Sequence, residues 1–299
     1  MPRVSYVNGS YVSHAHANVH VEDRGFQFAD GVYEVIACIH GHLADEQGHL
    51  DRLERSLAEL DIDMPMPRRT LQMVMRELLR RNHLKSATVY IQVTRGQAKR
   101  DFIFPAAHVA PSIVVITRPF NFEKTNKCEK GVTAFTVPDI RWKRRDVKSV
   151  ALLPQVLARQ SAYARGGAEA WLVDDDGLIT EGAASNAWIV KGSRIITRPP
   201  SHSILRGVTR TALMKIANDL QMTVEERAFT PDEAYKADEA FSTGAAALIV
   251  PIVKLDDHVI GTGVPGPVAR RLYEEYRAYA DGLRGAQLKW VSGLNDKNG

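Results

Sequence analysis

The chain has 299 residues, of which 44% are hydrophobic and 25% charged, and its formal net charge is +4. This composition excludes intrinsic disorder, a collagen-like repeat and a small disulfide scaffold. The longest uninterrupted apolar stretch, residues 245–253, contains a proline and is far shorter than the roughly 18 residues that a membrane helix needs. We therefore expect no membrane span, and so small a net charge predicts no nucleic-acid partner.

Two further features of the sequence bear on location and domain number. The N-terminus runs straight into strand-like sequence without a basic-then-apolar leader, and the two isolated cysteines, Cys38 and Cys128, are typical of reduced thiols. We expect a cytoplasmic protein. The length exceeds that of one typical domain, which favours two lobes.

Residues 1–118 are predicted to form an α+β lobe. Asn8-Gly9 is a hairpin-turn dipeptide within a strand pair. Apolar spacing then predicts a strand, two amphipathic helices and two more strands, at residues 31–39, 50–60, 71–79, 89–93 and 113–116. Strands with a helix pair grouped together indicate an α+β arrangement rather than a doubly wound sheet.

Residues 119–131 turn polar and are the expected linker, followed by a second lobe at 132–282. Its predicted elements are a strand, a helix, a four-strand meander and two helices, at residues 132–137, 154–165, 170–173, 178–181, 187–190, 194–197, 208–220 and 268–279. Residues 283–299 have no periodicity and are expected to be a peripheral tail.

Several common functional motifs are absent. The sequence has no Walker-type glycine loop, no paired-cysteine zinc spacing and no Gly-x-Ser-x-Gly elbow. His14, His16 and His20 lack ligand spacing, and the acidic triplet 174–176 precedes Gly177 as a hairpin turn does, without the further spacing of a calcium loop. We predict no metal site.

The basic run at residues 141–148 permits three interpretations. Trp142 among five cations suits a nucleic-acid surface, but no second basic cluster accompanies the run. A solvated strand edge is the simpler structure. The third interpretation makes one of the lysines a catalytic amine, and spacing alone does not choose among them.

Five segments together resemble the motifs of one family, in the same order. They are Asp23 to Val35, His49 to Leu53, Asp139 to Trp142 with Asp146 to Ser149, Thr180 to Gly182 with Ser185-Asn186, and Ile204 to Arg210. Across residues 5–280 the chain is similar to D-amino-acid transaminases of PLP fold type IV. The resemblance implies a small α/β N-terminal lobe, a larger C-terminal lobe with a meander or barrel-like sheet and flanking helices, pyridoxal 5'-phosphate (PLP) as cofactor, and a homodimer.

The resemblance assigns Lys148 as the Schiff-base lysine, whose freed amine shuttles the substrate proton. Without the resemblance, Lys148 is one more charge in a basic run, although the apolar residues 150–153 favour a partly desolvated amine with a lowered pKa. Glu181 is assigned to the pyridine nitrogen, where a carboxylate keeps the ring protonated as an electron sink. A lone glutamate is more often solvent-facing.

The other cofactor contacts are likewise implied by the resemblance. The backbone N–H groups at the start of the predicted helix 208–220 form one anion site for the phosphate. The small-residue loop at 242–246 offers a second one, and we call these two sites the cradles. Taken alone, Gly207 and Thr209 are also compatible with a turn residue and an ordinary helix cap, and Arg52 with a solvated helix-face charge. Arg141 is assigned beside the phenolic oxygen of the ring, and the phosphate contacts are assigned to Arg52, Gly207, Val208, Thr209, Thr243, Gly244 and Ala245.

The segment 93–105 resembles the loop that reaches into the partner's active site and binds the substrate carboxylate. Arg100 matches the family's arginine and Tyr33 its tyrosine, whereas Phe102 replaces its histidine. Loss of one donor to a charged group costs roughly 1.5–3 kcal/mol. Either Arg100 suffices for D-amino acids, or specificity is relaxed towards larger or carboxylate-free amines; a solvated Arg100 is the remaining alternative.

We expect transfer of the amino group of a D-amino acid, D-alanine-like, to a 2-oxo acid such as 2-oxoglutarate or pyruvate. The same fold and the same lysine and glutamate roles occur in aminodeoxychorismate lyases and in transaminases for L-branched-chain amino acids, and (R)-primary amines are a further substrate class. A non-catalytic binding protein built on the basic run would need neither Lys148 nor Glu181.

Overall fold

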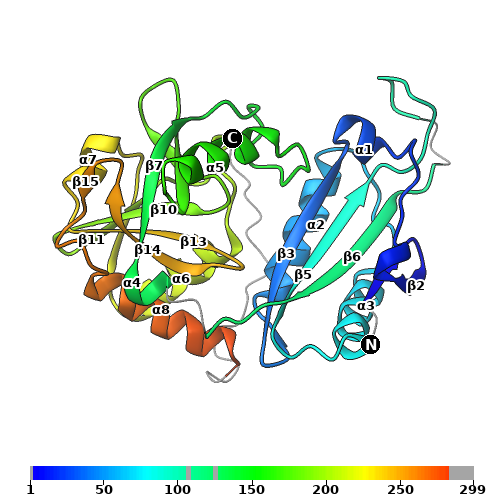
Figure 1. Ribbon diagram of the computed structural model, residues 1–299, viewed down its shortest axis with the longest axis horizontal. Helices are drawn as coiled ribbons and strands as arrows, with labels where there is room; N and C mark the ends of the chain where they lie inside the picture. Colours follow the sequence, from blue (N-terminus) through cyan, green and yellow to red (C-terminus); the bar gives the residue numbers. More distant parts are fainter. Residues whose placement is uncertain (1–2, 106–108, 124–126, 283–299) are drawn as a thin grey trace.

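The computed structural model describes residues 3–105, 109–123 and 127–282 and contains two β-sheets, one in each half of the chain (Figure 1). The predicted tail, residues 283–299, lies outside the described residues. The helices within the described ranges are all too short or too polar for a transmembrane segment.

The first sheet is antiparallel, with the strand order β2-β1-β6-β5-β3-β4. Asn8 and Gly9 both have positive φ, 44° and 94°, as the predicted hairpin turn requires. The strands are β1 Val4–Val7, β2 Ser10–Ser13, β3 Gly31–Ile39, β4 His42–Leu43, β5 Ala87–Thr94 and β6 Ser112–Pro119.

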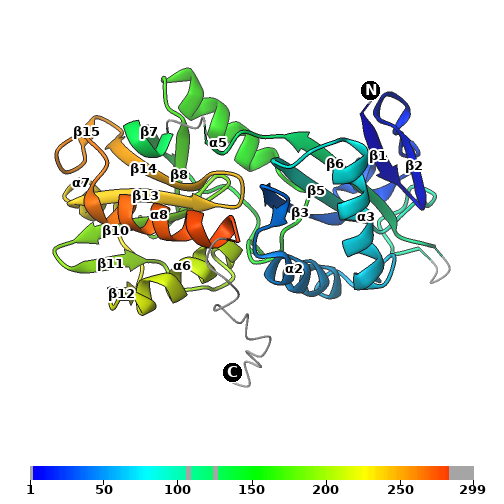
Figure 2. The same ribbon diagram turned by 90° about the horizontal axis from the view of Figure 1, so that it is seen from below.

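Two helices, α2 Glu46–Ala58 and α3 Arg68–Arg81, cover one face of this sheet (Figure 2). Alternate residues of β3, such as Val32 and Ile36, are buried against leucines of both helices. Because side chains alternate across a strand, Tyr33 and Val35 point to the opposite face, which borders the second half of the chain. Two short helices, η1 His14–His16 and α1 Arg24–Phe28, precede β3.

The second sheet has the order β12-β11-β10-β13-β14-β7-β8-β9, with β15 paired to β14. Its strands are β7 Val132–Pro138, β8 Glu169–Val173, β9 Ile179–Gly182, β10 Asn186–Lys191, β11 Arg194–Thr197, β12 Thr223–Glu226, β13 Glu239–Gly244, β14 Leu248–Leu255 and β15 His258–Val259. The helices of this half are α4 Lys127–Lys130, α5 Leu153–Ala164, α6 Val208–Asp219, α7 Pro231–Tyr235 and α8 Pro267–Ala280.

The predicted four-strand meander is interrupted in the structure. β9 pairs with β8, but β10 pairs with β11 and β13, so no ladder joins β9 to β10. The break falls at the small residues 183–185, between Glu181 and Asn186. The curled sheet brings these two side chains together without a hairpin between their strands, since Asn186 Nδ2 lies 3.0 Å from Glu181 Oε2.

The segment predicted as a polar linker holds more structure than expected. It contains α4 and two buried side chains, Phe122 and Cys128. Phe122 joins a core that combines residues of both halves, Ile39 and Trp188 among them. The two halves are also joined where the phenols of Tyr276 and Tyr279 on α8 donate to Asp45, at 2.8 and 2.6 Å.

Candidate active site

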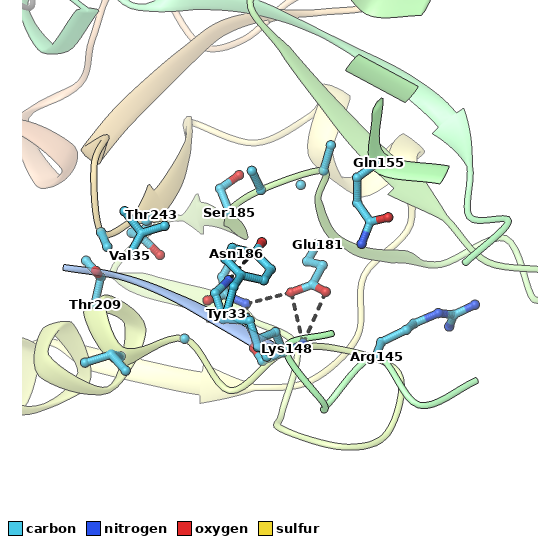
Figure 3. A pocket seen from close by; sticks show the side chains of 18 of the residues that line it. Tyr33, Val35, Arg145, Lys148, Gln155, Glu181, Ser185, Asn186, Thr209 and Thr243 are labelled. Carbon is cyan, nitrogen blue, oxygen red and sulfur yellow. Dashed lines mark hydrogen bonds between the residues drawn. The ribbon is translucent and has the colours of Figure 1, made fainter. Parts of the chain in front are cut away.

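A pocket lies between the two halves of the chain, and six segments contribute to it (Figure 3). They are β3, α2, the segment before α5 with the first turn of that helix, the β9–β10 junction, the N-terminus of α6 and the end of β13. Of the predicted site residues, those that line the pocket are Tyr33, Arg52, Arg141, Lys148, Glu181, Gly207, Val208, Thr209, Thr243, Gly244 and Ala245.

Lys148 is held by backbone contacts to β3. The Tyr33 N–H donates to the Lys148 carbonyl at 3.0 Å, and Val32 forms an isolated bridge with Ser149. The Lys148 amine lies 3.3 Å from the Tyr33 hydroxyl and 4.4 Å from the centre of its ring. The sheet of the first half therefore fixes the lysine against the tyrosine.

Glu181 is a buried carboxylate with donors from three segments, and Figure 3 shows it beside one of them, Asn186. Arg141 Nη1 donates to it at 2.5 Å, Asn186 Nδ2 at 3.0 Å and the Leu205 N–H at 3.1 Å. Burial raises the pKa of Glu181, and Arg141 opposes that effect only in part. The carboxylate is thus rigidly held, not solvent-facing.

Arg141 is held between two carboxylates. Its Nε and Nη2 donate to Asp139 at 2.9 and 2.8 Å, and the Thr180 hydroxyl donates to the same carboxylate at 2.8 Å. Burial alone would lower the pKa of Arg141, but Glu181 and Asp139 raise it above its usual value. The guanidinium therefore stays charged beside Glu181.

The run at residues 141–148 is not a strand edge, because residues 139–152 form no helix or strand. Its arginines form ion pairs with carboxylates instead: Arg141 pairs with Glu181, and Arg144 with Glu59 and Asp146. The acidic triplet does form the hairpin turn between β8 and β9, where the Asp174 side chain accepts from the Leu178 N–H at 2.9 Å. No group of three or more potential metal ligands occurs among the described residues.

The N-terminus of α6 presents free donors to the pocket. Gly207 is the N-cap, no side chain caps the helix, and the Thr209 hydroxyl is buried without a hydrogen-bond partner of ordinary geometry. Thr209 is thus the second residue of the helix and not its cap. A Cβ at Gly207 would lie 1.9 Å from Asn186 Oδ1, so this close approach requires glycine.

The second cradle predicted from the sequence lies at the end of β13. Thr243 is buried, and its hydroxyl oxygen accepts from Trp188 Nε1 at 2.9 Å, which leaves its own proton free to donate. Gly244 and Ala245 continue along the same wall of the pocket.

Arg52 reaches the pocket from α2 and is paired with a buried glutamate that the sequence reasoning missed. Its Nε and Nη2 donate to Glu34 at 2.7 and 2.8 Å, and its Nη1 donates to the Arg206 carbonyl at 3.0 Å. His49 Nδ1 lies 2.7 Å from the same carboxylate. A charged residue in the apolar strand 31–39 was the signal that could have revealed this network.

Comparison with known proteins identifies the family. The family model described as amino-transferase class IV matches residues 31–255. The chain belongs to the class IV aminotransferases. It is 37% identical to a D-alanine aminotransferase of Staphylococcus aureus (strain N315) over 92% of this chain and 97% of that one, and 37% identical to a D-alanine aminotransferase of Bacillus licheniformis over 89% and 93%.

Solved structures of the family have the same fold. A branched-chain amino acid aminotransferase of Escherichia coli superposes with a TM-score of 0.89 at 26% identity, over 97% of this chain and 98% of that one. A branched-chain amino acid aminotransferase of T.th., solved with pyridoxamine 5'-phosphate, gives 0.88 at 26% identity, over 95% and 96%. This class IV aminotransferase therefore has fold type IV and PLP as its cofactor.

The residues of the pocket fit this cofactor. PLP needs an amine for its aldehyde, a partner for its ring nitrogen and an anion site for its phosphate. The pocket offers the Lys148 amine, the buried Glu181 carboxylate, and a helix N-terminus with an unpartnered buried hydroxyl at Thr209.

Two predicted substrate contacts of this aminotransferase lie outside the pocket. Arg100 is exposed and its guanidinium carbon lies 5.0 Å from the centre of the Phe28 ring, while Phe102 is 82% exposed. Neither lines the pocket of its own chain. Sequence reasoning also gave no role to Arg145, Gln155 or Asn186, which do line it.

Proposed function

We propose that this class IV aminotransferase moves the amino group of a D-amino acid, D-alanine-like, to a 2-oxo acid such as 2-oxoglutarate or pyruvate. The observation that carries the proposal is the 37% identity to D-alanine aminotransferases over 92% of the chain. The apposition of Lys148, Tyr33 and Glu181 in one pocket supports it.

The proposed roles follow from the contacts. Lys148 holds the cofactor and, when substrate replaces it, takes the proton from the substrate Cα. Bound PLP supplies the electron sink for the pair left at Cα. Glu181, fixed by Arg141 and Asn186, would keep the ring nitrogen protonated, and Arg141 would contact the phenolic oxygen of the ring.

The remaining pocket residues bind and orient. The proposed phosphate site is Arg52, held by Glu34, together with the two cradles at Gly207-Val208-Thr209 and Thr243-Gly244-Ala245. Tyr33, 3.3 Å from the Lys148 amine, is placed to orient the substrate beside that amine.

We further propose a homodimer in which the loop carrying Arg100 and Phe102 binds the substrate carboxylate in the partner's pocket. The exposure of both side chains supports this. The lobes proposed are residues 1–118 and 132–282, joined by 119–131. We also propose a cytoplasmic location, because both cysteines are free thiols.

A second candidate is transfer from L-branched-chain amino acids, which the superposition on the Escherichia coli branched-chain enzyme favours. Relaxed specificity for (R)-primary amines rests on Phe102, and aminodeoxychorismate lyase activity rests on the shared fold. The identity to D-alanine aminotransferases ranks the D-amino acid first.

A half-reaction screen tests the choice. The purified holoenzyme is mixed with D-alanine, D-glutamate, L-valine, L-leucine or (R)-1-phenylethylamine, each alone, and the visible absorbance of the cofactor is followed. We expect rapid conversion by D-alanine. Rapid conversion by L-valine without conversion by D-alanine would overturn the proposal, and pyruvate release from aminodeoxychorismate would support the lyase.

A further inference from the structure

Three arginines line the pocket, and two of them are already paired with buried carboxylates of the protein. Arg52 binds the Glu34 carboxylate and a backbone carbonyl. Arg141 binds both Asp139 and Glu181. Most donors of both guanidiniums are therefore held by the protein, and the roles proposed above for Arg52 and Arg141 toward the cofactor use the donors that remain.

Arg145 differs from the other two. Its Nε lies 3.4 Å from Asp139 Oδ2, beyond good hydrogen-bond geometry, and is buried without a hydrogen-bond partner among the described residues. The Asp139 carboxylate already accepts shorter bonds from Arg141 and the Thr180 hydroxyl. With 13% of its side chain exposed, Arg145 is a largely buried cation whose donors are little used by the protein.

Arg145 also lies away from the phosphate cradle. In Figure 3, Thr209 and Thr243 are on one side of Lys148, and Arg145 and Gln155 are on the other. The Gln155 amide oxygen is buried without a hydrogen-bond partner, and the amide nitrogen of the same side chain is the group that can donate to an anion. An anion here would be distinct from the cofactor phosphate.

We propose that Arg145, assisted by the Gln155 amide, binds a carboxylate of the amino-acid or 2-oxo-acid substrate within its own chain's pocket. The inference rests on the proposed function, because both substrates of an amino-acid transamination carry a carboxylate. A guanidinium presents a planar fork of donors that matches a carboxylate. This contact adds a substrate-binding cation to the one proposed to come from the partner's loop.

Binding of carboxylates that do not react tests the proposal without requiring turnover. Dissociation constants for acetate and for succinate are measured by calorimetry on the wild-type holoenzyme and on Arg145→Met, which keeps the aliphatic bulk. Lys143→Met is the matched control, because Lys143 is an exposed cation of the same segment that does not line the pocket. Arg145→Gln, with a polar side chain, replaces the methionine variant if that variant does not fold.

We expect Arg145→Met to weaken binding by about ten- to hundredfold, as loss of a charge-assisted contact does, and Lys143→Met to leave it unchanged. Weakening for both ligands assigns Arg145 to the α-carboxylate, and weakening for succinate alone assigns it to a second carboxylate, as in D-glutamate. Wild-type affinity in the Arg145 variants, or no saturable binding to the wild type, overturns the inference. Failure of D-alanine to convert the cofactor would instead overturn the proposed function.

Discussion

Glu34 shows how a single buried residue links stability to the site. Burial alone would raise its pKa, but Arg52, with help from His49, holds the pKa of Glu34 at about 2, below its usual 4.5. The pKa in the folded state is therefore the lower one. The stabilisation is complete above about pH 4.5 and is lost as the pH falls from there towards 2.

Glu34→Gln is predicted to lower the free energy of unfolding at pH 7, because Arg52 loses its buried carboxylate. The same substitution is predicted to make the free energy of unfolding less dependent on pH in the acid range. For the wild type, a pKa difference of this size corresponds to a fall of about 3 kcal/mol in the free energy of unfolding between pH 5 and pH 2. Urea unfolding at a series of pH values measures it, with the exposed Glu274→Gln as control. An acid slope in Glu34→Gln equal to that of the wild type would contradict the account.

Individual residues were predictable from the sequence only in part. The motifs and their resemblance to a family pointed to Lys148, Glu181 and the two cradles, all of which line one pocket. The pairing of Glu34 with Arg52 and His49 was not predicted, because it depends on how α2 packs on β3. The same holds for Arg145, whose place in the pocket comes from loop geometry that no spacing encodes.

At the scale of elements, the N-terminus of α6 is built around one glycine. The Cβ of Gly207→Ala would collide with Asn186 Oδ1, and Asn186 in turn donates to Glu181 and to the Leu205 carbonyl. We predict that this substitution weakens PLP binding by about ten- to hundredfold, since it displaces a donor to a buried carboxylate. Fluorescence titration of the apoenzyme with PLP measures the effect.

The control is Gly177→Ala, at a turn with φ of 76° whose Cβ position is open. An alanine in this conformation costs about 1 kcal/mol of stability and leaves the cofactor affinity unchanged. Wild-type affinity for PLP in Gly207→Ala would show that the close approach to Asn186 does not matter.

Most elements followed from local periodicity, and the strand 31–39 has the predicted bounds. The order of the second sheet did not, because β7 lies parallel between β14 and β8, a pairing between distant segments. Local pattern also missed α1, α7 and β12, which are only four or five residues long, and the longer strands β13 and β14. Thus the periodicity predicted the strands on either side of the break between β9 and β10, but not the break itself.

At the scale of the whole molecule, the exposed loop of Arg100 predicts sites shared between two subunits. Arg100→Ala and Lys148→Ala are each predicted to be nearly inactive with D-alanine. If the subunits exchange when the two variants are mixed, one site of each mixed dimer combines an intact Lys148 with an intact Arg100, and activity returns. Steady-state assays of the mixture, with size-exclusion chromatography, measure this.

Two outcomes would contradict the shared site. One is an active monomer at 33.2 kDa. The other is mixed dimers, verified by differential tagging, that stay as inactive as the parent variants.

The central claim is that Lys148 carries the cofactor in the pocket between the two halves. Borohydride reduction of the purified holoenzyme, followed by peptide mass spectrometry, tests it most directly. We predict the pyridoxyl group on the peptide that contains Lys148, and no labelling of the nearby Lys143. Labelling of a different lysine, or no incorporation after reconstitution with PLP, would contradict the account.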